Sequence, residues 1–599
     1  MKKIIFILIL FAGYAESNLF GQAPDIEWQN TIGGSDDDEI FTAEQTDDGG
    51  YILGGTSLSG ISADKTEASL GWDYWLVKID AAGEIEWQNT MGGTEFDYLY
   101  SVHQTVDGGY ILGGQSYSGI GGDKSESHMG DGDIWIVKVN SIGEIEWENT
   151  IGGALYENMY SLQVTSDGGY ILGAMSASGI SGDKTEESNG VTDYWVVKLD
   201  VDGNIEWQNS IGGAGTDQLF YIEQTSDFGY ILTGSSASGV GGDKTETILG
   251  GKDYWVVKLN SSGSIEWQNT IGGAADDKSY AIHQTPDGGY IVGGISISDL
   301  SGDKTENGNG GEDYWVLKLN DIGNIEWQNT IGGNGDDELF SAIPTIDGGY
   351  LISGTSDSEM SGDKEEENFG EYDYWVVKLF PDGSIHWQNT IGGTGDDILY
   401  FSALQSDDEG YLLGGYSTSD SGIDKTEDAL GSYDYWILKL YGDECVPVTY
   451  YADTDGDDFG DLNNSIDTCF LIAGYVSNAL DCDDSDASIY PGATELPDGI
   501  DNNCNDTIDE GLVEILNVLE GNHFNIYPNP AINNFIIELT TTLTENLNVE
   551  IYNYAGQVIY IKEIQHSITN IEMDDIASGI YFIRVGNHNS YSEKKLIIE

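Results

Sequence analysis

Residues 265–324 read IEWQNTIGGAADDKSYAIHQTPDGGYIVGGISISDLSGDKTENGNGGEDYWVLKLNDIGN, and close copies of this stretch decide the fold. Its Glu-Trp-Gln-Asn segment or a variant of it begins at Glu27, Glu86, Glu146, Glu206, Glu266, Glu326 and His386. The copies follow one another at nearly even spacing. A fixed period of about 60 residues indicates a repeat architecture.

Each repeat contains four strand-like runs. In the quoted repeat they are Ile265–Ile271, Ser279–Thr285, Tyr290–Gly294 and Asp313–Leu319, with an Asp-Gly-Gly turn at Asp287 between the second and the third. The runs are rich in aromatic and β-branched residues, and Asp-Gly is a strong hairpin signal. Four strands in a repeat of this length are typical of a propeller blade.

The phase of the repeat predicts how the ring closes. The first unit opens with a lone strand at Ile26–Asn30, and the seventh ends on Tyr435–Leu440 with no such strand after it. Pairing Trp28 with the Trp436 strand would complete the last blade and remove an exposed sheet edge. We therefore expect an all-β fold with a seven-bladed β-propeller over residues 24–441, closed by the N-terminal strand, and not a linear solenoid.

Hairpin counting predicts a set of cross-strand ion pairs. With Asp80 facing Glu84 across a three-residue loop, Lys78 stands opposite Glu86. The same counting pairs Lys138 with Glu146, Lys198 with Glu206, Lys258 with Glu266, Lys318 with Glu326 and, across the closure, Lys439 with Glu27, while Lys378 faces His386. Opposite charges at such positions contribute roughly 0.2–1 kcal/mol each.

Tryptophan recurs in two strands of every repeat, as Glu-Trp and Tyr-Trp, and Trp72 is the one extra copy. Large aromatics dominate core energetics, so we expect these rings to pack between blades and not to form a platform for sugars.

Every repeat also carries an Asp-Lys-Thr-Glu loop or a close variant. These loops begin at Asp64, Asp123, Asp183, Asp243, Asp303, Asp363 and Asp424. One reading is a ring of calcium sites, with Asp303, Glu306 and Asp313 as oxygen donors in one repeat. The preferred reading is that Asp and Thr satisfy loop backbone groups while Lys and Glu form exposed pairs.

The overall charge limits the partners. Lys plus Arg total 22 against 104 Asp plus Glu, a formal net charge of −82. Such a chain repels nucleic acids and anionic membranes. Lys2 and Lys3 precede an apolar run, which predicts a signal peptide at 1–23, and no segment is long enough to span a bilayer. We expect a secreted or outer-surface protein.

A cysteine- and Asp-rich module is expected at 445–512. Asp453, Asp455, Asp457, Phe459 and Asp461 follow the spacing of an EF-hand-type loop, without its Gly and its final Glu. Further candidate ligands are Asp481, Asp483, Asp501, Asn503, Asn505, Thr507 and Asp509. Oxygen ligands at this density predict Ca²⁺. Cys445, Cys469, Cys482 and Cys504 allow two disulfides in three connectivities.

Two stretches resemble known families of bacterial surface proteins. The repeats, with their Asp-Gly-Gly-Tyr-Ile-Leu-Gly-Gly segments, resemble tandem repeats of proteins exported by type IX secretion. The stretch Tyr450 to Gly511 resembles a thrombospondin-type-3-like metal-binding motif, through Tyr-Tyr-Ala-Asp-Thr-Asp-Gly-Asp, Asp481-Cys-Asp-Asp and Asp498-Gly-Ile-Asp-Asn-Asn-Cys504. Its relatives usually carry one more cysteine, where Leu496 and Pro497 stand here.

Residues 524–599 are expected to form an Ig-like β-sandwich, from strand-like runs such as Phe535–Leu539 and Gly579–Val585. The domain resembles the type A sorting domain of type IX secretion cargo through Tyr527-Pro-Asn-Pro, Asn553-Tyr-Ala-Gly and Ala577-Ser-Gly-Ile-Tyr-Phe. That resemblance implies the type IX machinery as a partner.

We expect a non-enzymatic surface binding or adhesion protein that presents one rim of the propeller to a glycan or protein. No set of unlike catalytic groups stands out, and His103, His283 and His386 are interpreted as isolated, solvated strand residues. The alternatives are a carbohydrate-active enzyme that uses the central channel and a structural spacer.

Overall fold

A computed structural model describes residues 22–443, 448–457, 459–468, 474–496, 498–505, 507–508, 524–540, 547–573, 576–587 and 590–599. The predicted signal peptide lies almost wholly outside these residues, and so do Cys445, Cys469 and Asp509. The chain divides into two compact units, Met1–Val446 and Pro447–Glu599. The described residues form strands, turns and loops and contain no helix, so no helix among them could cross a membrane.

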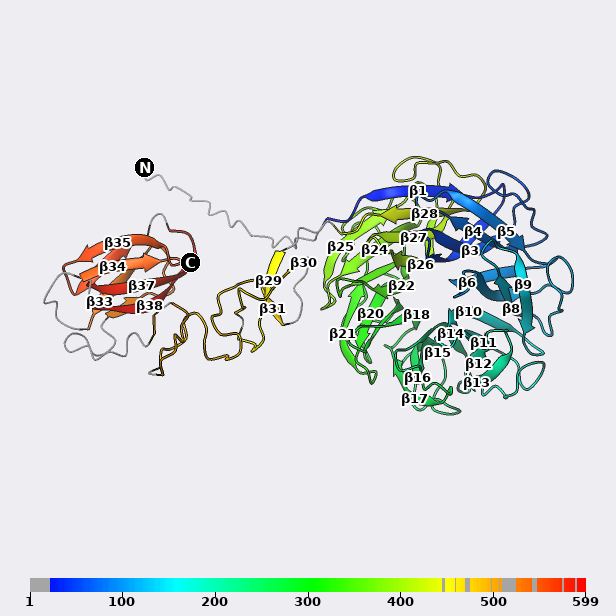
Figure 1. The fold of residues 1–599 in the computed structure, drawn as a ribbon, viewed down its shortest axis with the longest axis horizontal. Helices are drawn as coiled ribbons and strands as arrows, with labels where there is room; N and C mark the ends of the chain where they lie inside the picture. The colour runs from blue at the N-terminus through cyan, green and yellow to red at the C-terminus, as the bar shows by residue number, and fades with distance from the viewer. Residues whose placement is uncertain are drawn as a thin grey trace, which may run out of the picture. The chain divides into compact units, whose positions relative to one another are not determined.

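The first unit consists of seven four-stranded antiparallel sheets (Figure 1). The innermost strands are β2 (Asp38–Gln45), β6 (Asp97–Gln104), β10 (Glu157–Val164), β14 (Asp217–Gln224), β18 (Asp277–Gln284), β22 (Asp337–Pro344) and β26 (Asp397–Gln405). The second strands are β3 (Tyr51–Ser57), β7 (Tyr110–Ser116), β11 (Tyr170–Ser176), β15 (Tyr230–Ser236), β19 (Tyr290–Ser296), β23 (Tyr350–Ser356) and β27 (Tyr411–Ser417). The third strands are β4 (Asp73–Ile79), β8 (Asp133–Val139), β12 (Asp193–Leu199), β16 (Asp253–Leu259), β20 (Asp313–Leu319), β24 (Asp373–Leu379) and β28 (Asp434–Leu440). The outer strands are β5 (Ile85–Met91), β9 (Ile145–Ile151), β13 (Ile205–Ile211), β17 (Ile265–Ile271), β21 (Ile325–Ile331), β25 (Ile385–Ile391) and, in the last sheet, β1 (Ile26–Ile32).

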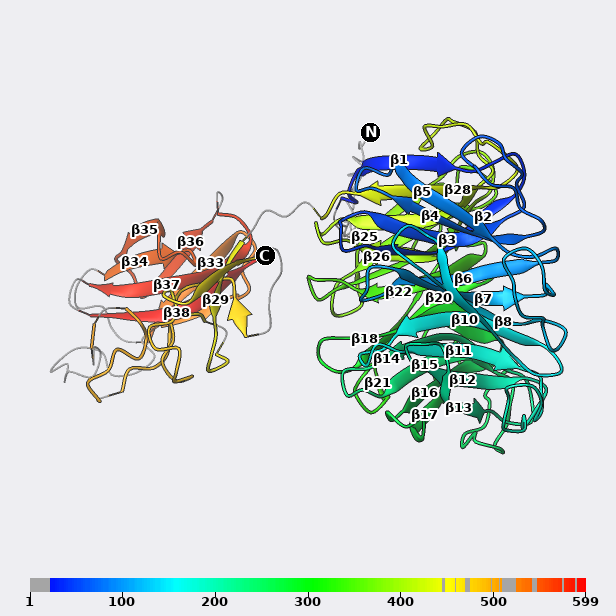
Figure 2. The ribbon, with the colours of Figure 1, turned by 45° about the vertical axis from the view of Figure 1, so that its right-hand side comes forward.

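The predicted closure by the N-terminal strand is confirmed. β1 pairs antiparallel with β28, and Trp28 stands opposite Lys439 in that ladder. The last sheet therefore has the order β1-β28-β27-β26, with its outer strand drawn from the start of the chain. Both views of the ribbon place β1 along β28 (Figure 1 and Figure 2).

The hydrophobic core lies between the sheets. Seven clusters of buried residues each join two neighbouring sheets, and one of them joins Ile437 of the last sheet to Leu53 and Trp75 of the first. The tryptophans of the third strands are fully buried, whereas those of the outer strands are half-buried except Trp387. The prediction that the tryptophans are packing residues is confirmed most clearly for the third strands.

Tyrosine hydroxyls link successive sheets around the ring. Tyr194 on β12 donates to the backbone carbonyl of Trp255 on β16 at 3.0 Å. The equivalent Tyr435 of the last sheet donates to the carbonyl of Trp75 in the first sheet at 3.2 Å. The link that connects consecutive repeats thus also connects the two ends of the repeat array.

The predicted ladder register is wrong by one residue, although the ion pairs form. A β-bulge between Lys78 and Ile79 sets Lys78 opposite Trp87, so Glu86 occupies the bulge. The Lys–Glu pairs nevertheless close at 3.0–3.3 Å in five sheets and at 3.6 Å between Lys439 and Glu27. A second carboxylate binds the same lysine: Asp48, in the turn before β3, pairs with the buried Lys78 at 3.1 Å.

The second unit contains three further sheets. One has the order β30-β29-β31, from β29 (Val448–Ala452), β30 (Ser465–Thr468) and β31 (Tyr475–Val476). The other two are β32-β33-β36 and β35-β34-β37-β38, from β32 (Phe524–Tyr527), β33 (Asn534–Leu539), β34 (Leu547–Tyr552), β35 (Val558–Ile564), β36 (Ile568–Glu572), β37 (Gly579–Asn587) and β38 (Ser590–Ile598). Phe535 of β33 and Ile551 of β34 share one buried cluster, so these two sheets enclose a common core.

Candidate functional site

The Asp-Lys-Thr-Glu loops cover the outer edge of each sheet. In the fourth sheet the Glu246 carboxylate accepts the backbone N–H of Thr270 on the outer strand β17 at 2.7 Å. The equivalent contact forms in all seven sheets, at 2.6–3.0 Å. An unpaired strand edge is a template for aggregation, and these carboxylates occupy part of it. The loop is therefore an edge cap built into every repeat.

The lysine of this loop is buried, which corrects the expectation of an exposed Lys–Glu pair. The Lys244 ammonium lies 4.7 Å from the ring centroid of Trp255 and donates to the Thr270 hydroxyl at 2.5 Å. Burial lowers the pKa of Lys244 to about 8. A desolvated cation over a tryptophan face gains from the ring quadrupole, so this lysine fastens the loop onto the sheet.

The alternative of calcium at these loops gains no support. Asp303, Glu306 and Asp313 each accept a different backbone N–H, at 2.8–3.3 Å. No group of acidic side chains close enough to hold a metal occurs among the described residues of this unit. The preferred reading, in which Asp of the loop satisfies backbone groups, is confirmed.

A second set of acids is buried inside the ring. Asp253, at the start of β16, accepts the backbone N–H of Leu249 with one carboxylate oxygen, and its other oxygen has no partner. That oxygen points at Gly272, where any side chain would collide with it. Burial, together with the charge of Asp277 on the next sheet, raises the pKa of Asp253 to about 6. The ionised Asp253 carboxylate therefore destabilises the fold, and its protonation removes that destabilisation.

The acidic module brings part of the predicted ligand set together. One carboxylate oxygen from each of Asp455, Asp457 and Asp481 lies within 4.8 Å of the others, and Asp455 also forms such a group with Asp453 and Asp484. Both oxygens of Asp455 and one each of Asp457 and Asp481 are buried without a hydrogen-bond partner. Orphaned carboxylate oxygens at this density fit a hard cation with oxygen ligands.

Other predicted ligands of the module make contacts of their own. Asp461 accepts the backbone N–H of Asn463, and Asp483 accepts the hydroxyl of Ser485. Phe459 stacks on Tyr490, with ring centroids 5.6 Å apart. Asp501 belongs to none of the acidic groups among the described residues. Its carboxylate accepts the backbone N–H of Asn505, whose side-chain oxygen accepts the backbone N–H of Thr507.

Asp484 is a candidate ligand that the sequence prediction left out of its set. Its two oxygens accept the N–H and the hydroxyl of Thr454, at 2.7 and 2.6 Å, which brings the 481–486 loop against the 453–457 loop. Cys482 is bonded to Cys504, so one predicted disulfide is confirmed. That bond ties the predicted second ligand run to Asp481.

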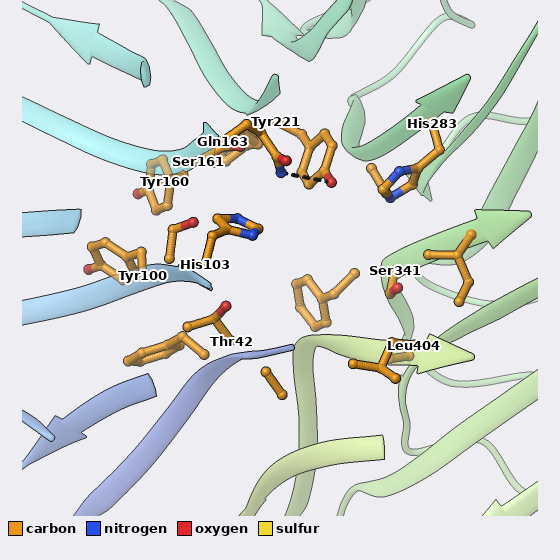
Figure 3. A pocket seen from close by; sticks show the side chains of 18 residues that line it. Thr42, Tyr100, His103, Tyr160, Ser161, Gln163, Tyr221, His283, Ser341 and Leu404 are labelled. Atoms are coloured by element: carbon orange, nitrogen blue, oxygen red, sulfur yellow. Dashed lines mark hydrogen bonds between the residues drawn. The ribbon is translucent and has the colours of Figure 1, made fainter. Parts of the chain in front are cut away.

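The centre of the ring is a channel lined by the innermost strands (Figure 3). Its floor is a circle of one aromatic ring from each sheet, with successive centroids 4.4–5.5 Å apart: Phe41, Tyr100, Tyr160, Phe220, Tyr280, Phe340 and Tyr400. Over these rings lies a cavity of about 220 Å³.

Two of the three histidines interpreted as isolated line this cavity, which corrects that interpretation. His103 lies 3.3 Å from the Glu44 carboxylate, and His283 lies 2.6 Å from the Glu223 carboxylate. Both imidazoles remain about one-fifth exposed, at 21 %. His386 is on the outer strand β25, half-buried against Phe380, where burial lowers its pKa.

Two family models match the second unit. Residues 525–599 match the model described as "Secretion system C-terminal sorting domain". Residues 481–510 match the model described as "Putative metal-binding motif", which includes Asp481 and the disulfide. The sorting domain indicates export to the cell surface or the extracellular space and implies interaction with the type IX secretion machinery.

Two curated proteins are similar over part of the chain. Ulvan lyase NLR42 of Nonlabens ulvanivorans is 36% identical over 75 residues, which cover 12% of this chain and 14% of that protein. Regulatory protein FlaEY of Caulobacter vibrioides is 24% identical over 351 residues, which cover 54% of this chain and 36% of that protein. The matches therefore span well under half the length of both relatives.

Solved structures give only distant likeness. An ulvan lyase of a new polysaccharide lyase family aligns with a TM-score of 0.39 and 10% identity, over 69% of this chain and 96% of that one. A puromycin hydrolase aligns with a TM-score of 0.39 and 11% identity, over 73% of this chain and 60% of that one.

Proposed function

We propose that this chain is a non-enzymatic binding or adhesion protein of the outer cell surface, delivered by type IX secretion. The observation that carries the proposal is the sorting domain at residues 525–599, because a protein exported in this way acts on what it meets outside the cell. In this proposal the seven sheets are the blades of a seven-bladed β-propeller, and residues 524–599 form an Ig-like sandwich of the type A sorting class.

The uniformity of the ring supports a binding role over catalysis. The loop acids that recur in every sheet are engaged with backbone N–H groups, and the loop lysines are buried, six of them over a tryptophan face. An active site needs unlike groups that converge in one pocket. The repeated parts of the ring are occupied in holding it together, which leaves its surfaces and its channel for ligands.

The module adds a proposed calcium site. Asp455 belongs to both acidic groups. Its carboxylate would therefore either bridge two ions or contribute to one ion bound by either group. The unpartnered carboxylate oxygens would gain a partner in Ca²⁺, and binding would then stabilise the folded module. Calcium would thereby stiffen the segment that joins the ring to the sorting domain.

A glycan array together with a hydrolysis screen on polysaccharides tests the main proposal. We expect the secreted chain to retain glycans or surface proteins without releasing new reducing ends or unsaturated products. Deletion of 524–599 should hold the protein in the periplasm. Normal surface display of the truncated chain would refute the export route, and turnover of any polysaccharide would refute the binding role.

The second candidate is a carbohydrate-active enzyme with its site in the channel. The contact that favours it is the His283–Glu223 pair, because a histidine oriented by a carboxylate is a usual general base. The hydrolysis screen separates this candidate from the first, since only an enzyme produces cleaved material.

A further inference from the structure

The channel is a region where the repeats stop being equivalent. At one position of the innermost strand the seven sheets carry Glu44, His103, Gln163, Glu223, His283, Ile343 and Leu404. Five sheets in a row thus contribute polar side chains and the next two contribute aliphatic ones. In a chain whose other buried positions repeat so closely, a varied ring of residues is evidence of a separate role.

The five polar residues, here called the polar arc, are positioned by contacts between neighbouring sheets. One oxygen of the Glu223 carboxylate is hydrogen-bonded to the imidazole of His283 at 2.6 Å. The other oxygen accepts the backbone N–H of Gln284 at 3.1 Å. Gln163 donates to the Tyr221 hydroxyl at 3.4 Å, and the Tyr221 ring lies 4.9 Å from the imidazole of His283. Figure 3 shows Gln163, Tyr221 and His283 following one another along one side of the cavity. Hydrogen-bond donors and acceptors are therefore held in fixed positions.

The opposite wall is mainly apolar, with Ser341 as its hydroxyl group, and the floor is aromatic. Ile343 and Leu404 face the cavity from β22 and β26, and the aromatic circle closes it below. A pyranose ring has the matching two-sided character, since its hydroxyls need polar partners while its C–H face packs on apolar and aromatic groups. The cavity of about 220 Å³ is smaller than the roughly 300–1,000 Å³ of sites for drug-sized ligands, so it suits one ring.

Charge selects the kind of sugar. The described residues of the lining include no lysine or arginine, and both histidines are already paired with glutamates. The whole chain carries a formal charge of −82. A carboxylate or sulfate on the ligand would meet repulsion without a free cationic partner among those residues.

We infer that the channel cavity binds one neutral sugar ring, which His103, Gln163 and His283 hold and which packs against Ile343, Leu404 and the aromatic circle. Glu44 and Glu223 lie behind the lining and position the two histidines. This inference rests on the proposed binding function and gives it a ligand class and a site. The rim loops then serve structure, and recognition takes place at the channel.

Titration calorimetry of the full chain tests it with three methyl glycosides (glucoside, galactoside, mannoside), with methyl glucuronide and with glucosamine. We expect at least one neutral glycoside to bind with one site per chain, and the glucuronide to bind at least tenfold more weakly. Glu223→Gln should weaken the neutral glycoside at least tenfold. The matched control is Glu206→Gln, the same change on an outer strand, which should leave affinity unchanged.

His283→Gln is the second variant, and near-UV circular dichroism establishes that each variant keeps its fold. Equal affinity in Glu223→Gln, preference for the glucuronide, or no binding of any neutral glycoside would overturn the channel inference and leave surface binding standing if the glycan array is positive. Cleavage of oligosaccharides that is lost in Glu223→Gln would instead keep the site and overturn the non-enzymatic function.

Discussion

The ring and the acidic module are both rich in aspartate, but their carboxylates do opposite work. In the ring, Asp303 and its equivalents accept backbone N–H groups, and Asp227 and its equivalents hold a buried lysine. In the module, both oxygens of Asp455 are buried without a partner. The carboxylates of the ring accept hydrogen bonds from backbone N–H groups that have no other partner. Those of the module are arranged to bind a cation.

The two regions also differ in what holds them together. The ring has a hydrophobic cluster between every two neighbouring sheets, whereas the described part of the module buries few apolar side chains, Ala452 and Ile489 among them. A small segment without a core usually needs disulfides or a metal. The ring should therefore be stable without metal, and the module should not.

The largest test of this contrast is deletion of β1, residues 24–32. The last sheet would lose its outer strand, leaving β28 as an open edge and removing the packing of Ile32 between the last and first sheets. Loss of several core contacts at once should cost the ring more than about 5 kcal/mol of unfolding free energy and promote aggregation. Chemical denaturation and size-exclusion chromatography measure both effects, and unchanged stability would show that the ring does not depend on this closure.

The next largest test is chelation. EDTA should expose the segment 448–508 to proteases while the melting temperature of the ring stays within about 1 °C, a shift that corresponds to about 1 kcal/mol for a ring of this size. At a Ca²⁺ concentration of 100 times its Kd, binding would stabilise the module by about 2.7 kcal/mol. Asp455→Asn should remove most of that protection, with Asp483→Asn as the control because Asp483 belongs to neither acidic group. Equal protease sensitivity with and without Ca²⁺ would contradict the metal assignment.

The strands of the ring were predicted well from the sequence, because the recurring motifs mark where each repeat and each strand begins and ends. The predicted strands Ile265–Ile271 and Asp313–Leu319 coincide with β17 and β20, and the phase of the repeat located the closing strand. The one-residue bulge at Lys78 escaped prediction, because counting from the loop assumes an unbroken ladder. Such counting uses only the loop and the two strands that it connects.

The polar groups of the channel were missed for a different reason. Glu44 and His103 occupy the same position in adjacent repeats, and so do Glu223 and His283. Comparing that position across all seven repeats would have exposed the polar and apolar arcs. The burial of Lys244 could not be read in the same way, because a lysine beside Asp and Thr looks like a surface residue until the Trp255 face is placed beneath it.

A smaller test uses pH, to which the two regions should respond in opposite directions. In the ring, burial raises the pKa of Asp253 from 3.8 to about 6. A raised folded-state pKa contributes stability that is complete below about 3.8 and lost as the pH rises through about 6. The melting temperature of the ring should therefore increase by a few degrees from pH 7.5 to pH 5.

The module should lose Ca²⁺ over the same acid range. Burial raises the pKa of Asp455 and of Asp481, so protons compete with the metal as the pH falls. Calcium titrations at pH 7.5 and pH 5 measure this competition. Asp253→Asn should reduce the slope of the ring's melting temperature and leave the calcium titration unchanged; a ring that instead weakens steadily between pH 7.5 and pH 5 would contradict the assignment of the buried acids.

The smallest expected effect is a difference in stability between variants of two carboxylates that bind the same lysine. Lys258 pairs with Asp227 at 2.9 Å and with Glu266 at 3.3 Å. Glu266 is half-exposed, so Glu266→Gln should cost only about 0.2–1 kcal/mol of unfolding free energy. Partial burial works to raise the pKa of Asp227, but hydrogen bonds from Thr225 and Lys258 outweigh it and lower that pKa to about 2. Asp227→Asn should therefore cost more than Glu266→Gln, since it leaves the buried lysine with the weaker partner and also disturbs the turn. Urea denaturation of the two variants ranks them, and the reverse order would mean that the outer-strand glutamate, and not the turn aspartate, anchors the lysine.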